Sequence, residues 1–154
     1  MGNRAVIVSK NDIIKVGGVK TIKPTAIGVY LHWNGGQDSV RGFLEYCKAL
    51  EFRSTEYDRH YGFARLTQIA ANFFDDGLCI GTDLALNLDY DNGDNGVYVI
   101  DEWNIVDRLY FEGEEQNRFP LKEMMMSIAE RQPKAFKLTE KQIDKYIKKI
   151  GGKK

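Results

Sequence analysis

The feature that most restricts the fold is a strand-like run that ends at a glycine-rich turn and leads directly into a helical pattern. Over 27–33, apolar residues occupy alternate positions, as they do along a strand with one buried face. The run ends at Asn34-Gly35-Gly36, and apolar residues then recur at helical spacing over 40–50. Asp38 or Ser39 can accept hydrogen bonds from free amides of the first helical turn. We therefore expect a strand, a tight turn and a helix in immediate succession.

Strand, glycine-rich turn and helix is also the order found in many phosphate-binding sites. The turn at 34–36, however, lacks the Lys-Ser/Thr pair of a P-loop and the three-glycine spacing of dinucleotide-binding folds. The Asp38 carboxylate would also compete with a phosphate for the same amides. We interpret 34–36 as a structural corner, with a phosphate cradle as the alternative. For a ligand bound nearby, His32 and Asn34 would lie at its rim.

Further periodic segments indicate an α+β fold. Strands are expected at 4–9, at 13–16 and 19–22 around a Gly-Gly turn, and at 84–90, 97–100 and 105–111. Helices are expected at 61–74, after Pro120, and after the capping-box pair Thr139 and Gln142. The predicted architecture is an antiparallel β-sheet meander with two helices inserted after the N-terminal strands and two C-terminal helices. The 154 residues form one domain, 1–154, with a basic tail at 151–154.

Charge is unevenly distributed although the net charge is zero. The segment 75–115 holds twelve carboxylates and one cation, Arg108, whereas 134–154 holds eight lysines and two carboxylates. One interpretation is that the two segments attract each other, within a monomer or between subunits. The other is that the acidic segment faces a polar partner.

No metal or other cofactor is expected. The only histidines, His32 and His60, have no second ligand at zinc spacing, and Cys47 lies on an apolar helix face, where a thiol is inert. The Asp-rich segment 89–100 has a glycine and an isoleucine where a calcium loop needs oxygen ligands. We interpret its Asn-Gly steps at 91–96 as a hairpin loop.

The segment 53–65 is the strongest candidate for a ligand site, because three arginines, two tyrosines and a histidine gather at a loop-to-helix junction. Arginine pairs with phosphate, aromatic rings stack on bases, and the start of a helix attracts anions. Arg108 is a second, weaker candidate that could instead be paired internally. The predicted ligand-binding residues are Tyr57, Arg59, His60, Tyr61, Arg65 and Arg108. The alternative is a solvated junction with local ion pairs.

Three strings, GVYLHWNGGQDSVRGFLEYCK, YGFARLTQIAANFF and DNGDNGVYVIDEWNIVDR, resemble a family of small proteins encoded by phages and prophages of Gram-positive bacteria. The similarity spans Gly28 to Arg108. Many small phage proteins of this kind counter host defence. One class, the Thoeris anti-defence proteins, sequesters cyclic ADP-ribose-type signals as oligomeric sponges. The resemblance implies an anti-defence role and nucleotide binding, and it assigns no site residue.

We therefore expect a non-enzymatic phage protein that sequesters a small phosphorylated, cyclic nucleotide in the host cytoplasm. The alternative is an inhibitor of a host defence protein or nuclease that uses the acidic surface. An enzyme acting on nucleotides is a third reading, but no pair of carboxylates has a spacing that fixes an acid and a base. We expect no membrane segment and no direct binding to nucleic acid, and the sequence leaves homo-oligomerisation open.

Overall fold

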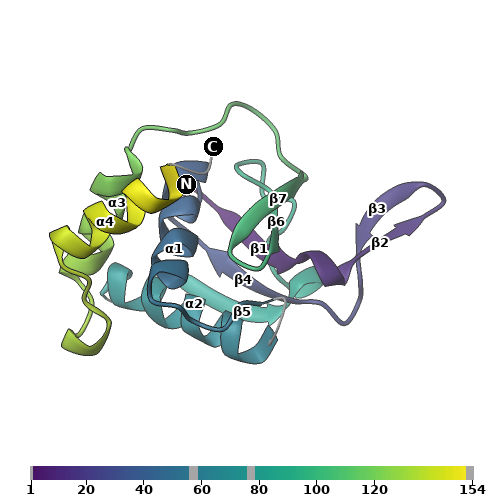
Figure 1. The fold of residues 1–154 in the computed structure, drawn as a ribbon. Helices are drawn as coiled ribbons and strands as arrows, with labels where there is room; N and C mark the ends of the chain where they lie inside the picture. Colours follow the sequence, from purple (N-terminus) through teal and green to yellow (C-terminus); the bar gives the residue numbers. More distant parts are fainter. Residues whose placement is uncertain (1, 56–58, 76–78, 152–154) are drawn as a thin grey trace.

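The computed structural model describes residues 2–55, 59–75 and 79–151. Its elements form an α+β fold with helices on one side of a sheet (Figure 1). The strands are β1 (Ala5–Ser9), β2 (Ile13–Val16), β3 (Val19–Ile22), β4 (Ile27–Leu31), β5 (Ile80–Leu84), β6 (Val97–Asp101) and β7 (Asn104–Leu109). The α-helices are α1 (Gln37–Ala49), α2 (Arg59–Phe74), α3 (Leu121–Glu130) and α4 (Glu140–Gly151). The α+β class and the placement of two inserted and two C-terminal helices are confirmed.

The main sheet has the strand order β5-β4-β1-β6-β7, and it is mixed. β4 pairs antiparallel with both β1 and β5, and β6 pairs antiparallel with β7, but β1 and β6 run parallel. The prediction of a purely antiparallel meander was therefore wrong. In this strand order β4 and β1 lie between β5 and β6, so the connection 85–96 has to cross both of them.

That crossover replaces both the strand expected at 84–90 and the hairpin loop expected at 91–96. After β5 the chain forms a short 3-10 helix at Ala85–Asn87, and Ala85 donates its amide to the Ala26 carbonyl at 2.7 Å. A Cβ atom on Gly28 would lie 3.2 Å from the Ala85 Cβ and 3.1 Å from Leu88 Cδ1. The missing side chain of Gly28 thus allows the crossover to lie directly against β4.

The two faces of the sheet carry separate apolar clusters. On β1, Ala5 and Ile7 pack into the larger cluster, which includes side chains of all four helices, while Val6 and Val8 pack into the smaller one. This alternation is the period of two expected for a strand buried on both faces. The smaller cluster is covered by Ile22, Ala26 and the crossover segment rather than by an α-helix.

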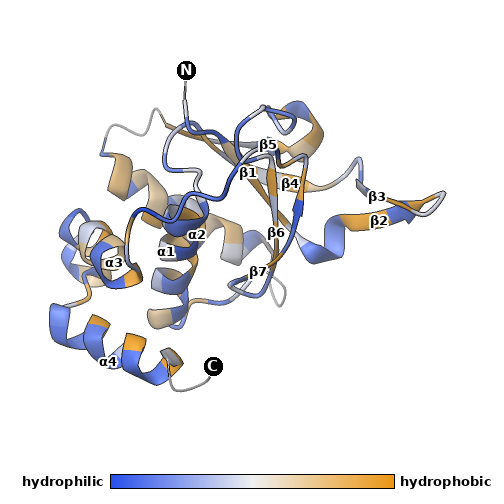
Figure 2. Ribbon diagram, turned by 90° about the horizontal axis from the view of Figure 1, so that it is seen from above, coloured by the Kyte–Doolittle hydropathy of each residue, from blue (hydrophilic) through white to orange (hydrophobic). Residues whose placement is uncertain are grey.

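The helix ends agree only in part with the capping predictions. α1 begins at Gln37 with Gly36 as N-cap and no side-chain cap, so neither Asp38 nor Ser39 caps it. The capping box of α4 is confirmed, because Thr139 N–H donates to Gln142 Oε1 at 2.8 Å and Gln142 N–H donates to Thr139 Oγ1 at 3.2 Å. α4 is also amphipathic: Figure 2 shows hydrophobic and hydrophilic residues alternating along it.

A two-stranded arm, β2 and β3, projects from the body of the molecule (Figure 1). Gly17 and Gly18 have φ of 58° and 82°, so both turn residues adopt the left-handed conformation that such a tight hairpin requires. Lys20 at the arm contacts Asp107 of β7 at 2.5 Å, which ties the arm to the sheet.

The acidic segment is neutralised in part from the N-terminal end of the chain. Arg4 pairs with Asp89 and Asp94, Lys10 with Asp101, and Lys20 with Asp107. In the described part of the chain no ion pair joins the lysines of 134–151 to the acidic segment. Among the described residues, the N-terminal cations rather than the C-terminal lysines therefore pair with the acidic segment.

Candidate functional site

The predicted site segment forms a hollow between the end of α1 and the start of α2. This arginine hollow has a volume of about 380 Å³ and is lined by Glu51, Phe52, Arg53, Tyr61 and Arg65. The Arg53 guanidinium lies 5.3 Å from the centre of the Tyr61 ring, and that of Arg65 lies 5.9 Å from the Phe52 ring. Both distances are typical of cation–π contacts. Two guanidinium groups and two aromatic rings therefore share one concave surface.

The backbone beneath the arginine hollow is held by specific contacts. Glu51 turns the chain with φ of 59°, and Phe52 then donates its amide to Cys47 O at 3.2 Å. Trp103 Nε1 donates to Phe52 O at 3.1 Å. A Cβ atom on Gly62 would lie 2.5 Å from the Thr55 backbone nitrogen, so α2 begins in direct contact with the preceding loop. The two sides of the hollow are thereby fixed relative to each other.

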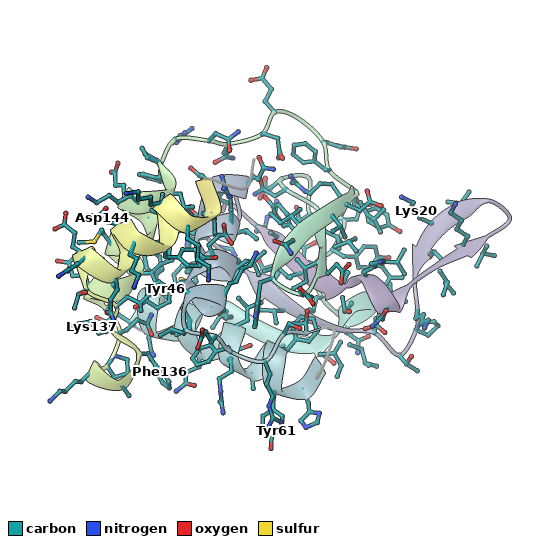
Figure 3. All side chains as sticks on the ribbon, in the orientation of Figure 1. Lys20, Tyr46, Tyr61, Phe136, Lys137 and Asp144 are labelled. Atoms are coloured by element: carbon teal, nitrogen blue, oxygen red, sulfur yellow. The ribbon has the colours of Figure 1, made fainter. Side chains whose placement is uncertain are left out.

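The predicted site residues are only partly brought together. Tyr61 and Arg65 line the arginine hollow, and Figure 3 shows Tyr61 pointing outward from the molecule. His60 is exposed, with its ring centre 4.7 Å from that of Tyr61, and it lines a neighbouring apolar depression. Tyr57 lies outside the described residues, and Arg59 is described only as the first residue of α2.

Arg108 does not join this group. Its guanidinium is held between the rings of Tyr98 and Phe111, at 3.8 and 4.0 Å, and it also pairs with Glu115. Its Nη2 donates to Asn95 O at 2.7 Å. All these contacts lie outside the arginine hollow, and they attach the segment after β7 to the sheet.

Phe52 and Arg53 were missing from the predicted set of ligand-binding residues. Arg53 belongs to the arginine-rich segment, so its composition signal was available. Phe52 had no such signal, because its role depends on the turn at Glu51, which places its ring beside the Arg65 guanidinium. Arg65 makes no ion pair with any described residue, so its charge is not balanced by a neighbouring carboxylate there.

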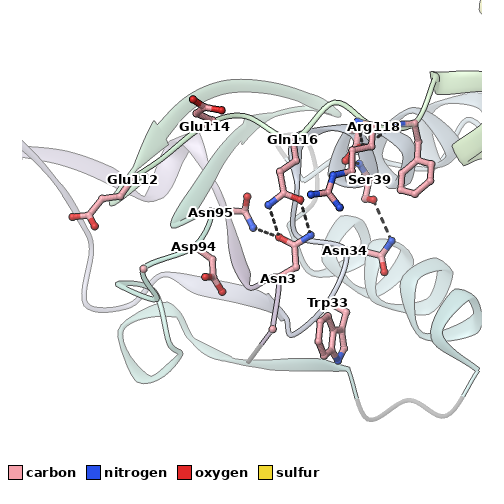
Figure 4. A pocket seen from close by; sticks show the side chains of 14 residues that line it. Asn3, Trp33, Asn34, Ser39, Asp94, Asn95, Glu112, Glu114, Gln116 and Arg118 are labelled. Atoms are coloured by element: carbon pink, nitrogen blue, oxygen red, sulfur yellow. Dashed lines mark hydrogen bonds between the residues drawn. The ribbon is translucent and has the colours of Figure 1, made fainter.

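A second hollow, larger than the first, lies at the edge of the sheet where β4 ends and α1 begins (Figure 4). This sheet-edge pocket has a volume of about 530 Å³ and is lined by residues of 2–3, 33–39, 93–95 and 112–119. It lies at the opposite end of α1 from the arginine hollow, roughly 20 Å away by the rise of a 13-residue helix. Asn34, the first residue of the Asn34-Gly35-Gly36 corner, thus lines a pocket.

Asp38 holds one wall of the sheet-edge pocket in place. Its carboxylate is largely buried and accepts hydrogen bonds from the amides of Arg118 at 2.8 Å and Phe119 at 3.0 Å. It also accepts from the Ser39 amide at 2.7 Å. We expected this carboxylate to accept hydrogen bonds from the amides of the first helical turn, where a phosphate would otherwise bind. It accepts one such bond, from Ser39, but its other two bonds attach the 112–119 segment to α1.

A network of side-chain amides forms a further part of the pocket lining. Asn3 exchanges hydrogen bonds with Gln116 at 3.2 and 3.3 Å, and Asn95 Nδ2 donates to Asn3 Oδ1 at 2.6 Å (Figure 4). Next to this network, burial raises the pKa of Asp94, but hydrogen bonds from the Arg4 side chain and amide outweigh this effect and hold the pKa below its ordinary value. The Asp94 carboxylate is therefore ionised and paired.

The thiol of Cys47 is enclosed in the larger apolar cluster. Burial raises the pKa of the Cys47 thiol, so the thiolate needed for nucleophilic attack is not populated. No three His, Cys, Asp or Glu side chains among the described residues are grouped so that they could hold a metal ion. None of the described helices is long and apolar enough to span a bilayer.

No protein-family model, curated protein sequence or solved structure matches this chain. What the two hollows can bind therefore follows from their own geometry and charge.

Proposed function

We propose that the protein is a non-enzymatic binder of a small phosphorylated nucleotide, held in the arginine hollow. The observation that carries the proposal is the Arg65 guanidinium, which stacks on Phe52 without a carboxylate partner among the described residues. An arginine held in this way keeps its fork of N–H donors available for phosphate oxygens. Arg53, over the Tyr61 ring in the same hollow, adds a second guanidinium.

The aromatic side chains supply the second part of the recognition. Tyr61 has 44% of its surface exposed, so part of its ring can receive a base next to the Arg53 guanidinium. The first turn of α2 lies beside the hollow, and its positive dipole end favours an anion there. Glu51 is a carboxylate in the wall, which favours a ligand whose phosphates lie on the Arg65 side.

We further propose that the protein acts by sequestration, as an accessory protein of a phage that counters a host defence signal. The resemblance of 28–108 to phage and prophage proteins supports this setting. The alternative of an inhibitor of a host protein is less favoured, because Arg4, Lys10 and Lys20 pair with part of the acidic segment. That pairing lowers the negative potential which a basic partner would require.

The test is a melting-temperature and calorimetry screen against cyclic mono- and dinucleotides, cyclic ADP-ribose and ADP-ribose. Binding of any of these to the native state raises the melting temperature, and mass spectrometry should recover the ligand unchanged. Arg65→Gln should weaken binding by roughly 10- to 100-fold, as expected for loss of a charge-assisted bidentate contact. Arg41→Gln is the matched control, since Arg41 is exposed on α1 and absent from the hollow. A panel without any shift, or equal loss in both variants, would contradict the proposal.

A further inference from the structure

The sheet-edge pocket contains buried polar side chains with unused hydrogen-bonding capacity. Asn95 is 1% exposed, and both protons of its Nδ2 are donated, to Asn3 and to the Arg4 carbonyl. Its Oδ1 accepts no hydrogen bond from any described residue, yet the side chain lines the pocket. The oxygen is not among the fully enclosed side-chain atoms that lack a partner, so it remains reachable and can accept a hydrogen bond from water or from a ligand.

Ser39, on the α1 side of the same pocket, presents the complementary group. It is 2% exposed, and its Oγ accepts a hydrogen bond from Asn34 Nδ2 at 3.2 Å. Among the described residues, no acceptor receives the proton of this hydroxyl. The pocket lining therefore offers one preformed acceptor and one preformed donor, each fixed by its other hydrogen bonds.

Two large aromatic side chains stand at the pocket without being covered by the rest of the chain. Trp33 is 46% exposed and Phe119 is 45% exposed, and both line the pocket. Trp33 is held by an edge-on contact with His32, with ring centres 5.4 Å apart. An exposed indole face beside polar groups is suited to a ligand that has one apolar and one polar surface.

The charges in the sheet-edge pocket disfavour phosphate. The carboxylates of Asp38 and Asp94 are already matched, the first by backbone amides and the second by Arg4. Glu112 and Glu114 remain exposed in the wall, and Arg118 is the one cationic side chain among the described lining residues. A phosphorylated ligand would meet net repulsion, whereas carboxylates accept hydrogen bonds well from neutral hydroxyl groups.

We propose that the sheet-edge pocket is a second binding site, independent of the arginine hollow, for a neutral polyhydroxylated ligand of one or two sugar rings. Trp33 stacks on the apolar face of one ring, Asn95 Oδ1 accepts a hydroxyl proton, and the Ser39 hydroxyl donates to a ring or hydroxyl oxygen. A volume of about 530 Å³ suits a ligand of this size. The walls are already fixed by the hydrogen bonds of Asp38 and Asn3, so binding needs little reorganisation.

The experiment is a titration of ¹⁵N-labelled full-length protein with a fixed set of probes, followed by NMR. The neutral probes are glucose, galactose, N-acetylglucosamine, maltose and lactose; glucose 6-phosphate and putrescine are the charged probes. We expect at least one neutral sugar to shift the Trp33 indole N–H and the Asn34 side-chain amide, saturating at roughly 1 mM or tighter. Glucose 6-phosphate should bind less tightly than the best neutral sugar.

Variants separate this site from the arginine hollow. Trp33→Ala should weaken sugar binding at least about 10-fold and Ser39→Ala about 5-fold, with the Asn34 amide as the reporter in both. Arg65→Gln should leave sugar affinity unchanged. The proposal is overturned if no neutral probe shifts these signals, if only putrescine does, or if glucose 6-phosphate binds more tightly. It is equally overturned if folded Trp33→Ala retains wild-type affinity.

Discussion

Removing the Asp38 carboxylate should destabilise the protein by about 2–4 kcal/mol. The carboxylate accepts hydrogen bonds from the amides of Arg118 and Phe119 at 2.8 and 3.0 Å, and charge-assisted bonds contribute about 1.5–3 kcal/mol each. We take about two thirds of the sum for Asp38→Ala, because Arg118 and Phe119 are exposed and water can replace part of the loss. Asp38→Asn keeps one acceptor oxygen and should lose about half as much.

Urea denaturation measures this loss directly, and the melting temperature should fall by roughly 2–4 °C per kcal/mol for a chain of this size. Limited trypsin digestion gives a local readout, because release of the 112–119 segment exposes the peptide bond after Arg118 to cleavage. Asp91→Ala is the control, since Asp91 is exposed and has no hydrogen bond with a described residue. A loss below about 1 kcal/mol in Asp38→Ala would refute the role assigned to the carboxylate, as would unchanged cleavage after Arg118.

Three further predictions concern other parts of the fold. Gly62→Ala places a Cβ 2.5 Å from the Thr55 nitrogen and should cost roughly 1–3 kcal/mol in urea denaturation; a neutral effect would contradict the close contact. Thr139→Ala removes the cap of α4 and should cost about 1 kcal/mol, measured in the same way; an unchanged stability would show that the cap contributes little. Because the pKa of Asp94 is lowered in the folded state, its pairing with Arg4 stabilises the protein above the ordinary carboxyl pKa, and this contribution disappears as pH falls through the lowered value. Arg4→Gln should therefore flatten the acid limb of the stability–pH curve, and an unchanged limb would show that other carboxylates determine it.

Local sequence patterns predicted most elements because their causes are local. The Gly17-Gly18 hairpin, the Thr139 capping box and the apolar spacing of α1 each depend on residues within a few positions of one another. The strand expected at 84–90 failed for a different reason. The alternate leucines have the spacing typical of a strand, but Ala85 is buried against Gly28 of β4, a residue far away in the sequence.

In the two hollows, too, the features with local causes could be predicted from the sequence and those that depend on distant contacts could not. Tyr61 and Arg65 are four residues apart on one helix, so the sequence predicts that they are neighbours. The approach of Phe52 to Arg65 depends on a backbone turn that composition does not reveal. The sheet-edge pocket was harder still to predict, because it combines four segments that meet only through the mixed strand order of the sheet.

The projecting arm offers a place to attach a reporter. Val16 and Val19 are 61% and 68% exposed, and no atom would lie within 4 Å of a Cβ on Gly17 or Gly18. A short affinity tag or a fluorescent peptide inserted between these glycines would lie in solvent, and exposed loop tips of this kind tolerate insertions well. Neither hollow includes a residue of the arm. The turn that completes the hairpin is therefore a suitable anchor for surface immobilisation, with both hollows left accessible to ligands.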